Sequence, residues 1–252
     1  MHRSAPRLAR ILACAAVPVM LAVTGCSSDS GDKTDKADKS AASGASGGGE
    51  GSSSESAAPQ AKKSPAVERE KFAKLPDACK SIPAKSVAEL VPETKTKGGT
   101  AGRSTDTMSR ASCSWNSLDD NGVKGSQYRW LDVAFLRYES DEALAVTGAK
   151  RAEDSFAKEL SKAQGVSGAK KVKTAELKGV GDRASAVTYE LRKTGEDFSY
   201  VTVVARTENA VVSLTYNGTG YAGAKPPAVS DLSKDAASAA KEAVGSVTAA
   251  NK

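Results

Sequence analysis

The sequence is poor in histidine and in aromatic residues. Its single histidine, His2, lies within the first 25 residues, so a chain that begins at residue 26 contains none. This absence excludes Ser-His-Asp and Cys-His catalysis and every metal site that needs an imidazole ligand. We therefore predict a protein that is not an enzyme and that holds no metal ion and no cofactor.

A long apolar run is also missing. The largely apolar stretch 11–23 has 13 residues, whereas a membrane-spanning helix needs roughly 20. Arg3, Arg7 and Arg10 accompany it without any acidic residue, which is typical of a secretory signal. Residues 1–25 are therefore expected to be a signal peptide that is removed.

The residues that end this stretch, VTGC at 23–26, resemble a bacterial lipobox. In such a motif the cysteine, here Cys26, carries diacylglycerol and becomes the first residue of the mature protein. Two or more acyl chains give stable attachment to a membrane. We expect a lipid-anchored protein on the extracytoplasmic face of the cell membrane; the alternative is an ordinary export signal followed by a chance cysteine.

Strong charge of either sign is lacking as well. Loss of the three arginines of the signal leaves 33 Lys plus Arg against 30 Asp plus Glu, a net charge of +3. The two signs are interspersed, and no basic run has interleaved aromatic residues. The sequence therefore predicts no nucleic-acid partner.

Cysteines are few, and two of the four are already accounted for. Cys14 leaves with the signal and Cys26 is the proposed lipid site, so Cys79 and Cys113 remain. An even remainder in an exported domain favours a disulfide over a reactive thiol. Closing a loop of about 35 residues contributes roughly 3 to 4 kcal/mol in the chain-entropy model.

Residues 26–70 are predicted to be a flexible tether. The stretch 27–66 contains 25 Ser, Gly or Ala and none of the larger apolar residues, so it cannot bury enough surface to offset its ordering entropy. The folded part is then 71–252, a length that suits one core.

Within the folded part, periodicity predicts helices and strands in a mixed order. A short helix is expected at 82–91, a long one at 141–163 with Ser140 as its N-cap, and a third at 230–247. Strands are expected at 111–117, 128–138, 184–191, 198–206 and 210–217, with a weak one at 171–177. Gly195 and Glu208-Asn209 suit hairpin turns, with Asn209 at positive φ. The order predicts an α+β fold, an antiparallel sheet of about five strands with helices packed against it in a single domain, and we expect a monomer.

Several short motifs, taken together, resemble a group of actinobacterial lipoproteins classed as a domain of unknown function. They are the lipobox, the Ser/Gly-rich tether, LPDACKSIPAKSVAELV, CSW about 34 residues later, KGVGDRAS and a small-residue-rich C-terminal helix. The resemblance covers most of residues 75–248. It implies an exported, disulfide-linked α+β domain of unassigned activity and carries over Cys26, Cys79 and Cys113. The loop 93–110 is longer and more polar than expected of that group.

Two places are candidates for binding. The polar loop 93–110 carries Lys95, Lys97, Arg103 and Arg110 and suits an anionic envelope component, or else is simply mobile. Tyr216, Asn217 and Tyr221 in YNGTGYAG suit a binding edge, or else a capping loop after the last strand. Trp115 and Trp130 lie on predicted strands, where burial is the default, and GVGD at 179–182 suits a tight turn better than a phosphate-binding loop.

These features predict a tethered, non-enzymatic binding or accessory domain of the cell envelope that contacts protein, glycan or lipid. Two alternatives stay open. One is a carrier of a hydrophobic ligand held between the sheet and helix 141–163. The other is a hydrolase that uses a Ser-Lys pair or two carboxylates.

Overall fold

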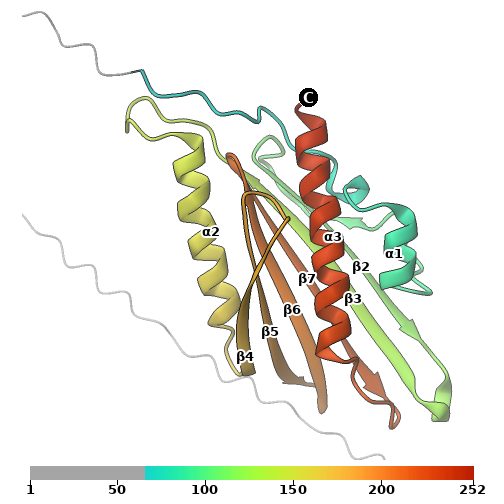
Figure 1. Cartoon of the computed structure of the whole chain (residues 1–252). Coiled ribbons are helices and arrows are strands. Elements are labelled where there is room, and N and C mark those ends of the chain that lie inside the picture. Colours follow the sequence, from blue (N-terminus) through green and yellow to red (C-terminus); the bar gives the residue numbers. More distant parts are fainter. Residues whose placement is uncertain (1–65) are drawn as a thin grey trace, which may run out of the picture. The chain divides into compact units, whose positions relative to one another are not determined.

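A seven-stranded antiparallel sheet with helices on both faces forms the described part of the protein in the computed structural model (Figure 1), which covers residues 66–252. The elements in chain order are η1 (Ala78–Lys80), α1 (Ala84–Leu90), β1 (Thr100–Ala101), β2 (Arg110–Asp119), η2 (Gly122–Lys124), β3 (Ser126–Arg137), α2 (Gly148–Gln164), β4 (Lys170–Leu177), β5 (Arg183–Lys193), β6 (Glu196–Thr207), β7 (Ala210–Tyr221) and α3 (Val229–Ala250). The predicted signal peptide, the lipid site Cys26 and the tether up to residue 65 lie outside the described residues.

The strands follow the order β1-β2-β3-β7-β6-β5-β4. The predicted α+β class is confirmed, but about five strands was wrong, since there are seven. The expected strands are present as β2, β3 and β5 to β7, and the weak one is β4. β1 was missed because its two residues, Thr100 and Ala101, are both exposed and lie within the polar loop, so no alternating pattern marks them.

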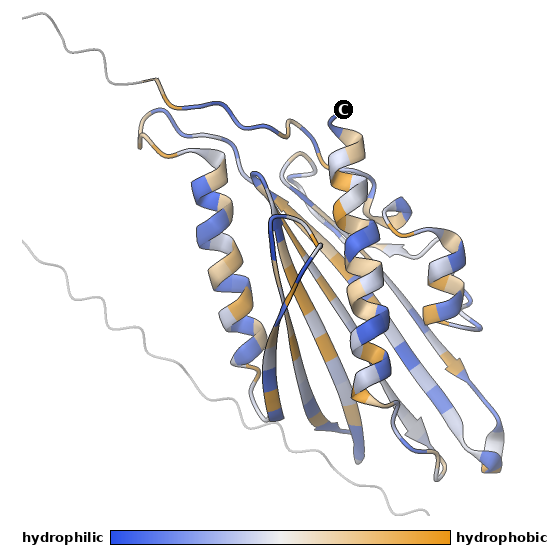
Figure 2. Ribbon diagram, viewed as in Figure 1, coloured by the Kyte–Doolittle hydropathy of each residue, from blue (hydrophilic) through white to orange (hydrophobic). Residues whose placement is uncertain are grey.

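The main core lies between the sheet and α3. Apolar residues alternate with polar ones along the strands (Figure 2). The buried residues of α3 recur at helical spacing from Leu232 to Val247. On β3 the predicted inward residues Leu131, Val133 and Phe135 are fully buried. They belong to the same cluster as Ala236 and Ala240 of α3, whose small side chains let the helix approach the sheet closely.

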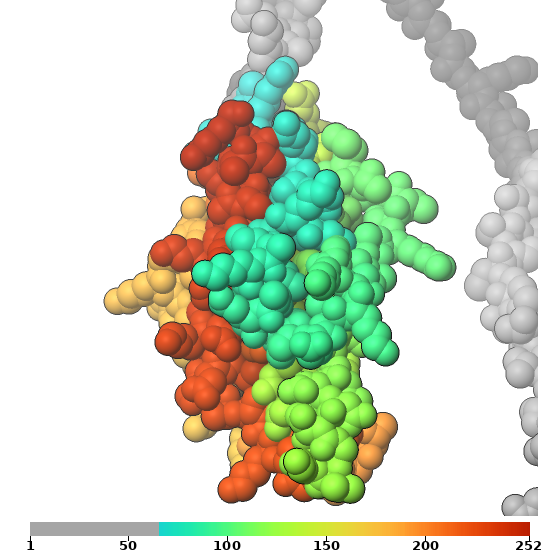
Figure 3. All heavy atoms as spheres, turned by 90° about the vertical axis from the view of Figure 1, so that its right-hand side faces the viewer, coloured from blue at the N-terminus to red at the C-terminus, as the bar shows by residue number. Residues whose placement is uncertain are grey.

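A disulfide closes one edge of this core. Cys79 of η1 is bonded to Cys113 of β2, so the predicted pairing is confirmed. The chain that follows η1 packs α1 beside α3 (Figure 3), where the Ser86 hydroxyl donates to the Glu242 carboxylate at 2.8 Å. The crosslink thus fixes the segment before β1 against the sheet.

Helix α2 covers the opposite face and begins later than predicted. Ser140 is not its N-cap: its hydroxyl donates to the Glu68 carbonyl at 2.6 Å and accepts from the Gly148 N–H. Asp141 and Val146 instead close a turn through two backbone hydrogen bonds. The true N-cap is Thr147, whose hydroxyl accepts from the Lys150 N–H at 3.1 Å, as hydroxyl caps commonly do.

The segment before η1 is held by a buried asparagine in the β6–β7 turn. Asn209 is 1% exposed; its side chain accepts from the Phe72 N–H and donates to the carbonyls of Phe72 and Tyr138. The predicted hairpin is present, but Glu208, not Asn209, takes the positive φ (51°). Asn209 therefore fixes the segment before η1 to the β6–β7 turn. Phe72 is the first buried residue of the described part.

The other two predicted turns are as expected. Thr194 and Gly195 connect β5 to β6 with φ of 49° and 88°, both in the left-handed region that two-residue hairpins favour. At 179–182, Gly181 has φ 62° and its Cα lies against the Arg206 carbonyl, so a side chain has no space there. GVGD is a turn that leads into β5.

Removal of the disulfide should cost a large part of the stability. We expect the Cys79→Ala/Cys113→Ala double variant to lose about 3 to 4 kcal/mol of unfolding free energy, because the bond closes a loop with a separation of 34 residues. Urea unfolding of both proteins measures this difference. Equal midpoints would show that the crosslink does not restrict the unfolded chain.

Replacement of Asn209 should detach the segment before η1 from the β6–β7 turn. Asn209→Ala leaves two backbone groups without partners, the buried Phe72 N–H and the partly buried Tyr138 carbonyl, whereas the Phe72 carbonyl still accepts from Arg137. We therefore expect a loss of at least about 2 kcal/mol and faster amide exchange at Phe72. Asn251→Ala is the matched control. Its side chain also binds this segment, at Ala73 and Lys74, but in exposed positions, so a loss below about 1 kcal/mol is expected.

Candidate functional site

Helix α2 leaves part of its sheet face uncovered. The helix crosses the sheet diagonally. At one end the Tyr138 hydroxyl bonds the Ser155 hydroxyl at 2.7 Å, and the contacts continue across Val211 and Val204 to Val187. No helix of the described chain packs on β2, the start of β3 or the end of β7 on this face. Two large side chains are consequently exposed there, Leu118 at 48% and Trp130 at 38%. Burial, predicted by default for Trp130, was therefore wrong, whereas Trp115 is buried as predicted.

The uncovered face contains two depressions that follow β3 end to end. One, of about 970 Å³, includes Ala134 and Leu136 of β3 and the segment 102–106; we call it the arginine end. The other, of about 630 Å³, includes Tyr128, Trp130 and Asp132 of β3; we call it the aromatic end. We refer to the two depressions together as the trough.

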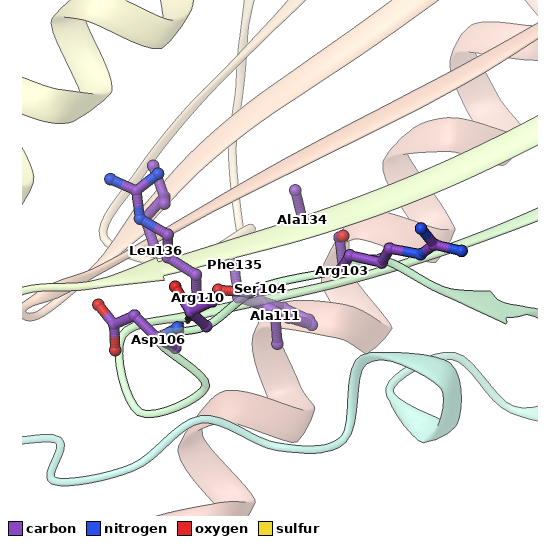
Figure 4. Close-up of a pocket in the computed structure, with 11 residues that line it drawn as sticks. Arg103, Ser104, Asp106, Arg110, Ala111, Ala134, Phe135 and Leu136 are labelled. Atoms are coloured by element: carbon purple, nitrogen blue, oxygen red, sulfur yellow. Dashed lines mark hydrogen bonds between the residues drawn. The ribbon is translucent and has the colours of Figure 1, made fainter.

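The arginine end has two arginines that do not converge. Arg103 and Arg110 line it and form no ion pair within residues 66–252. Figure 4 shows the Arg103 guanidinium pointing away from Arg110 and Asp106. A compact anion such as phosphate needs donors that point at one place, so this end lacks the geometry of a preformed anion site.

The predicted basic loop does not form a single patch. Lys95 and Lys97 are exposed, as is Arg103, but β1 divides the loop. The backbone at Gly99 lies over Cys113 and Trp115 on the α3 face, whereas Gly102 lies over Ser112 on the α2 face. The structure therefore brings Arg103, and not the two lysines, to the trough.

The predicted cluster at the end of β7 is also divided between the faces. YNGTGYAG is not a capping loop, since β7 continues to Tyr221. Tyr216 faces α3, where its hydroxyl donates to the Leu90 carbonyl at 2.6 Å and burial raises its pKa to about 12. Asn217 and Tyr221 face the other way and line the aromatic end. Tyr216 thus belongs to the core, and only the other two belong to the trough.

Asp132 is the most informative residue of the trough. It is half-buried on β3, and its carboxyl group makes no hydrogen bond and no ion pair with the described residues. Burial raises its pKa above the ordinary value. A desolvated carboxyl group without a partner costs stability, which marks a position shaped by something other than folding.

Asp132 was not among the predicted site residues, although the sequence contains a signal for it. The alternation that places Leu131 and Val133 in the core also places Trp130 and Asp132 together on the opposite face.

In the described chain, no group of three or more His, Cys, Asp or Glu is positioned to hold a metal ion. Over the same residues, no helix is long and apolar enough to cross a membrane.

Asp132→Asn should stabilise the protein at neutral pH. Because the folded state raises the pKa of Asp132, it keeps a proton that the unfolded chain releases, and stability falls as pH rises between the unfolded and folded pKa values. The Asn side chain does not titrate, so this loss of stability is absent in the variant. We expect the variant to have a higher Tm than the unchanged protein at pH 7, and a smaller difference between the two near pH 3.5. Asp119→Asn, at the exposed end of β2, is the control and should change neither. A lower Tm for Asp132→Asn at pH 7 would contradict the assignment.

Comparisons with known proteins add one partial likeness. No protein-family model matches the chain, and no curated protein matches it. Among solved structures, that of LpqN, described as involved in cell envelope biogenesis of Mycobacterium tuberculosis, is similar over 57% of this chain and 82% of LpqN, with 13% identity and a TM-score of 0.24. A likeness of this extent assigns neither fold nor function, so the site is interpreted from its own geometry.

Proposed function

We propose that this chain is an exported, lipid-anchored binding domain of the cell envelope, and that it holds its ligand in the trough beside α2 without transforming it. The sequence supports the anchor through the apolar stretch 11–23 and the lipobox-like residues that end at Cys26. The observation that carries the binding role is the uncovered sheet face, on which Trp130 is exposed and Asp132 is half-buried without a partner.

The lining of the aromatic end favours binding over catalysis. Asp132 is the one carboxylate that lines the aromatic end, so a pair of carboxylates for glycoside hydrolysis is not assembled there. No serine lines it either, and Lys193 therefore has no serine to activate. These groups suit hydrogen bonding and stacking.

The packing of α2 does not favour a carrier that encloses a hydrophobic ligand. Ala152 and Phe156 are fully buried between the helix and the sheet, against Val204 and Val211. This is where the hydrophobic-ligand carrier, left open as an alternative, would need its cavity, and side chains fill it. The open trough therefore presents its ligand to solvent, as a surface-binding domain does.

The proposed function predicts where envelope material contacts the protein. The mature chain with Cys26→Ser, labelled with ¹⁵N, is titrated with polar lipids, with glycans and with soluble proteins, each separated from the native envelope. We expect at least one fraction to shift the amide signals of Trp130, Asp132 and Asn217, whereas those of α3 stay unchanged. Shifts confined to the α3 face, or no shift with any fraction, would refute the proposal.

The anchor is tested on the protein from its native membrane by intact mass. An N-terminus at Cys26 that carries acyl chains supports the proposal. An unlipidated mature chain would remove the anchor from it while leaving the trough as a binding site.

A further inference from the structure

The strand register places two aromatic side chains on either side of an amide at the aromatic end. Trp130 of β3 is paired with Asn217 of β7, which is paired with Tyr200 of β6. All three line the same depression. Because neighbouring strands lie about 4.8 Å apart, Trp130 and Tyr200 originate about 10 Å from each other. Tyr200 is only 7% exposed, because the Tyr189 ring stacks on it with a centroid distance of 4.9 Å, so Trp130, at 38%, provides the aromatic face that a ligand can reach. We call the part of the depression between Trp130, Asp132 and Asn217 the slot.

The polar groups in this slot have no partner in the protein. Asn217 is only 6% exposed, and its side-chain amide makes no hydrogen bond with any described residue, yet it lines the depression. Asp132 occupies the next position on the same face of β3, and its carboxyl group is likewise unpartnered. Buried amides and carboxyls normally find partners. In this depression both side chains have donor or acceptor atoms that a bound molecule can use.

The charge of the slot disfavours an ionic ligand. Lys193 lies over the ring of Tyr200, with its ammonium nitrogen 5.1 Å from the ring centre, so the face that would attract a cationic group already faces a cation. Lys193 and Asp132 are the two charged side chains that line the depression, and they have opposite signs. A neutral ligand suits this balance best.

Aromatic faces and hydrogen-bonding groups together describe a specific class of ligand. A pyranose has C–H groups on its faces, which are attracted to the negative face of an aromatic ring, and hydroxyl groups around its rim. A carboxyl and an amide satisfy such hydroxyls with acceptors and a donor. An alkyl chain would leave Asp132 and Asn217 without partners, which is unfavourable in a desolvated slot.

We propose that the aromatic end of the trough binds a neutral sugar ring of an envelope glycan, with Trp130 on one face of the ring and Asp132 and Asn217 on its hydroxyls. This inference rests on the proposed function and narrows it to one ligand class and one end of the trough. The arginine end, which continues along β3 at Ala134 and Leu136, then provides space for the next units of the chain.

The test is a titration of the mature Cys26→Ser chain with four trisaccharides: maltotriose, cellotriose, mannotriose and chitotriose. Tryptophan fluorescence and amide chemical shifts monitor the binding. Trp115 and Trp130 are the two tryptophans of the chain, and Trp115 is buried, so a fluorescence change reports on Trp130. We expect saturable binding of at least one trisaccharide. Trp130→Ala and Asp132→Asn should each weaken it at least tenfold, and Trp130→Phe should weaken it less than Trp130→Ala.

Matched variants separate a direct role from misfolding. Leu118→Ala removes an exposed apolar side chain from the same face outside the depression, and Asp119→Asn removes a carboxyl from the end of β2; both should bind as the unchanged protein does. Thermal unfolding should show that Trp130→Ala is folded and that Asp132→Asn is no less stable than the unchanged protein. Equal binding by all variants would overturn the inference.

Two further probes separate this inference from the proposed function. Tetramethylammonium and 1-hexanol represent a cationic head group and an apolar chain. If either shifts the Trp130 and Asn217 signals and no trisaccharide does, the glycan assignment is wrong while the trough remains a binding site. If trisaccharides and all envelope fractions leave the trough unchanged, both proposals fail.

Discussion

The pairing of β3 with β7 is the constraint on which the rest of the structure depends. It extends over all 12 residues of β3 and joins the disulfide-linked β1–β3 part of the sheet to the β4–β7 meander. The same ladder puts Leu131 beside Tyr216 in the core and Trp130 beside Asn217 in the trough. A shift of one residue would exchange the two faces of β3, burying Trp130 and Asp132 under α3 and exposing Leu131.

The two faces of the sheet are stabilised to different extents. The α3 face combines a continuous buried cluster with the Cys79–Cys113 crosslink and the Tyr216 hydrogen bond to the Leu90 carbonyl. The α2 face has smaller clusters and an uncovered corner. The packed layer on the α3 face thus supports the sheet, while part of the other face stays open to a ligand. The stability provided by the α3 face offsets the unfavourable burial of Asp132.

Sequence reasoning succeeded where the signal is local. Alternation in 128–138 correctly assigned Leu131, Val133 and Phe135 to the core, and the count of cysteines correctly paired Cys79 with Cys113. It failed at the start of α2, because Asp141 and Glu142 suit a helix N-terminus as well as the turn that they actually form. It also missed β1, whose two residues have no pattern of their own.

The trough could be predicted only in part. Asn217 and Tyr221 were identified from the types of their side chains, but Tyr216 was grouped with them because its direction depends on which face of β7 meets α3. Trp130 and Asp132 join Asn217 only through the β3–β7 register, which connects positions far apart in the chain. The uncovered corner further depends on the diagonal path of α2, which no short stretch of sequence encodes.

The central claim is that the trough beside α2 is the surface that binds a component of the cell envelope. The most direct test is a photo-crosslinking amino acid at position 130 of the full-length chain in its native membrane, compared with the same residue at position 123. Val123 is 97% exposed and lies outside both depressions. The account predicts a crosslinked envelope glycan at position 130 and none at position 123. Equal products at both positions, or none at position 130, would contradict it.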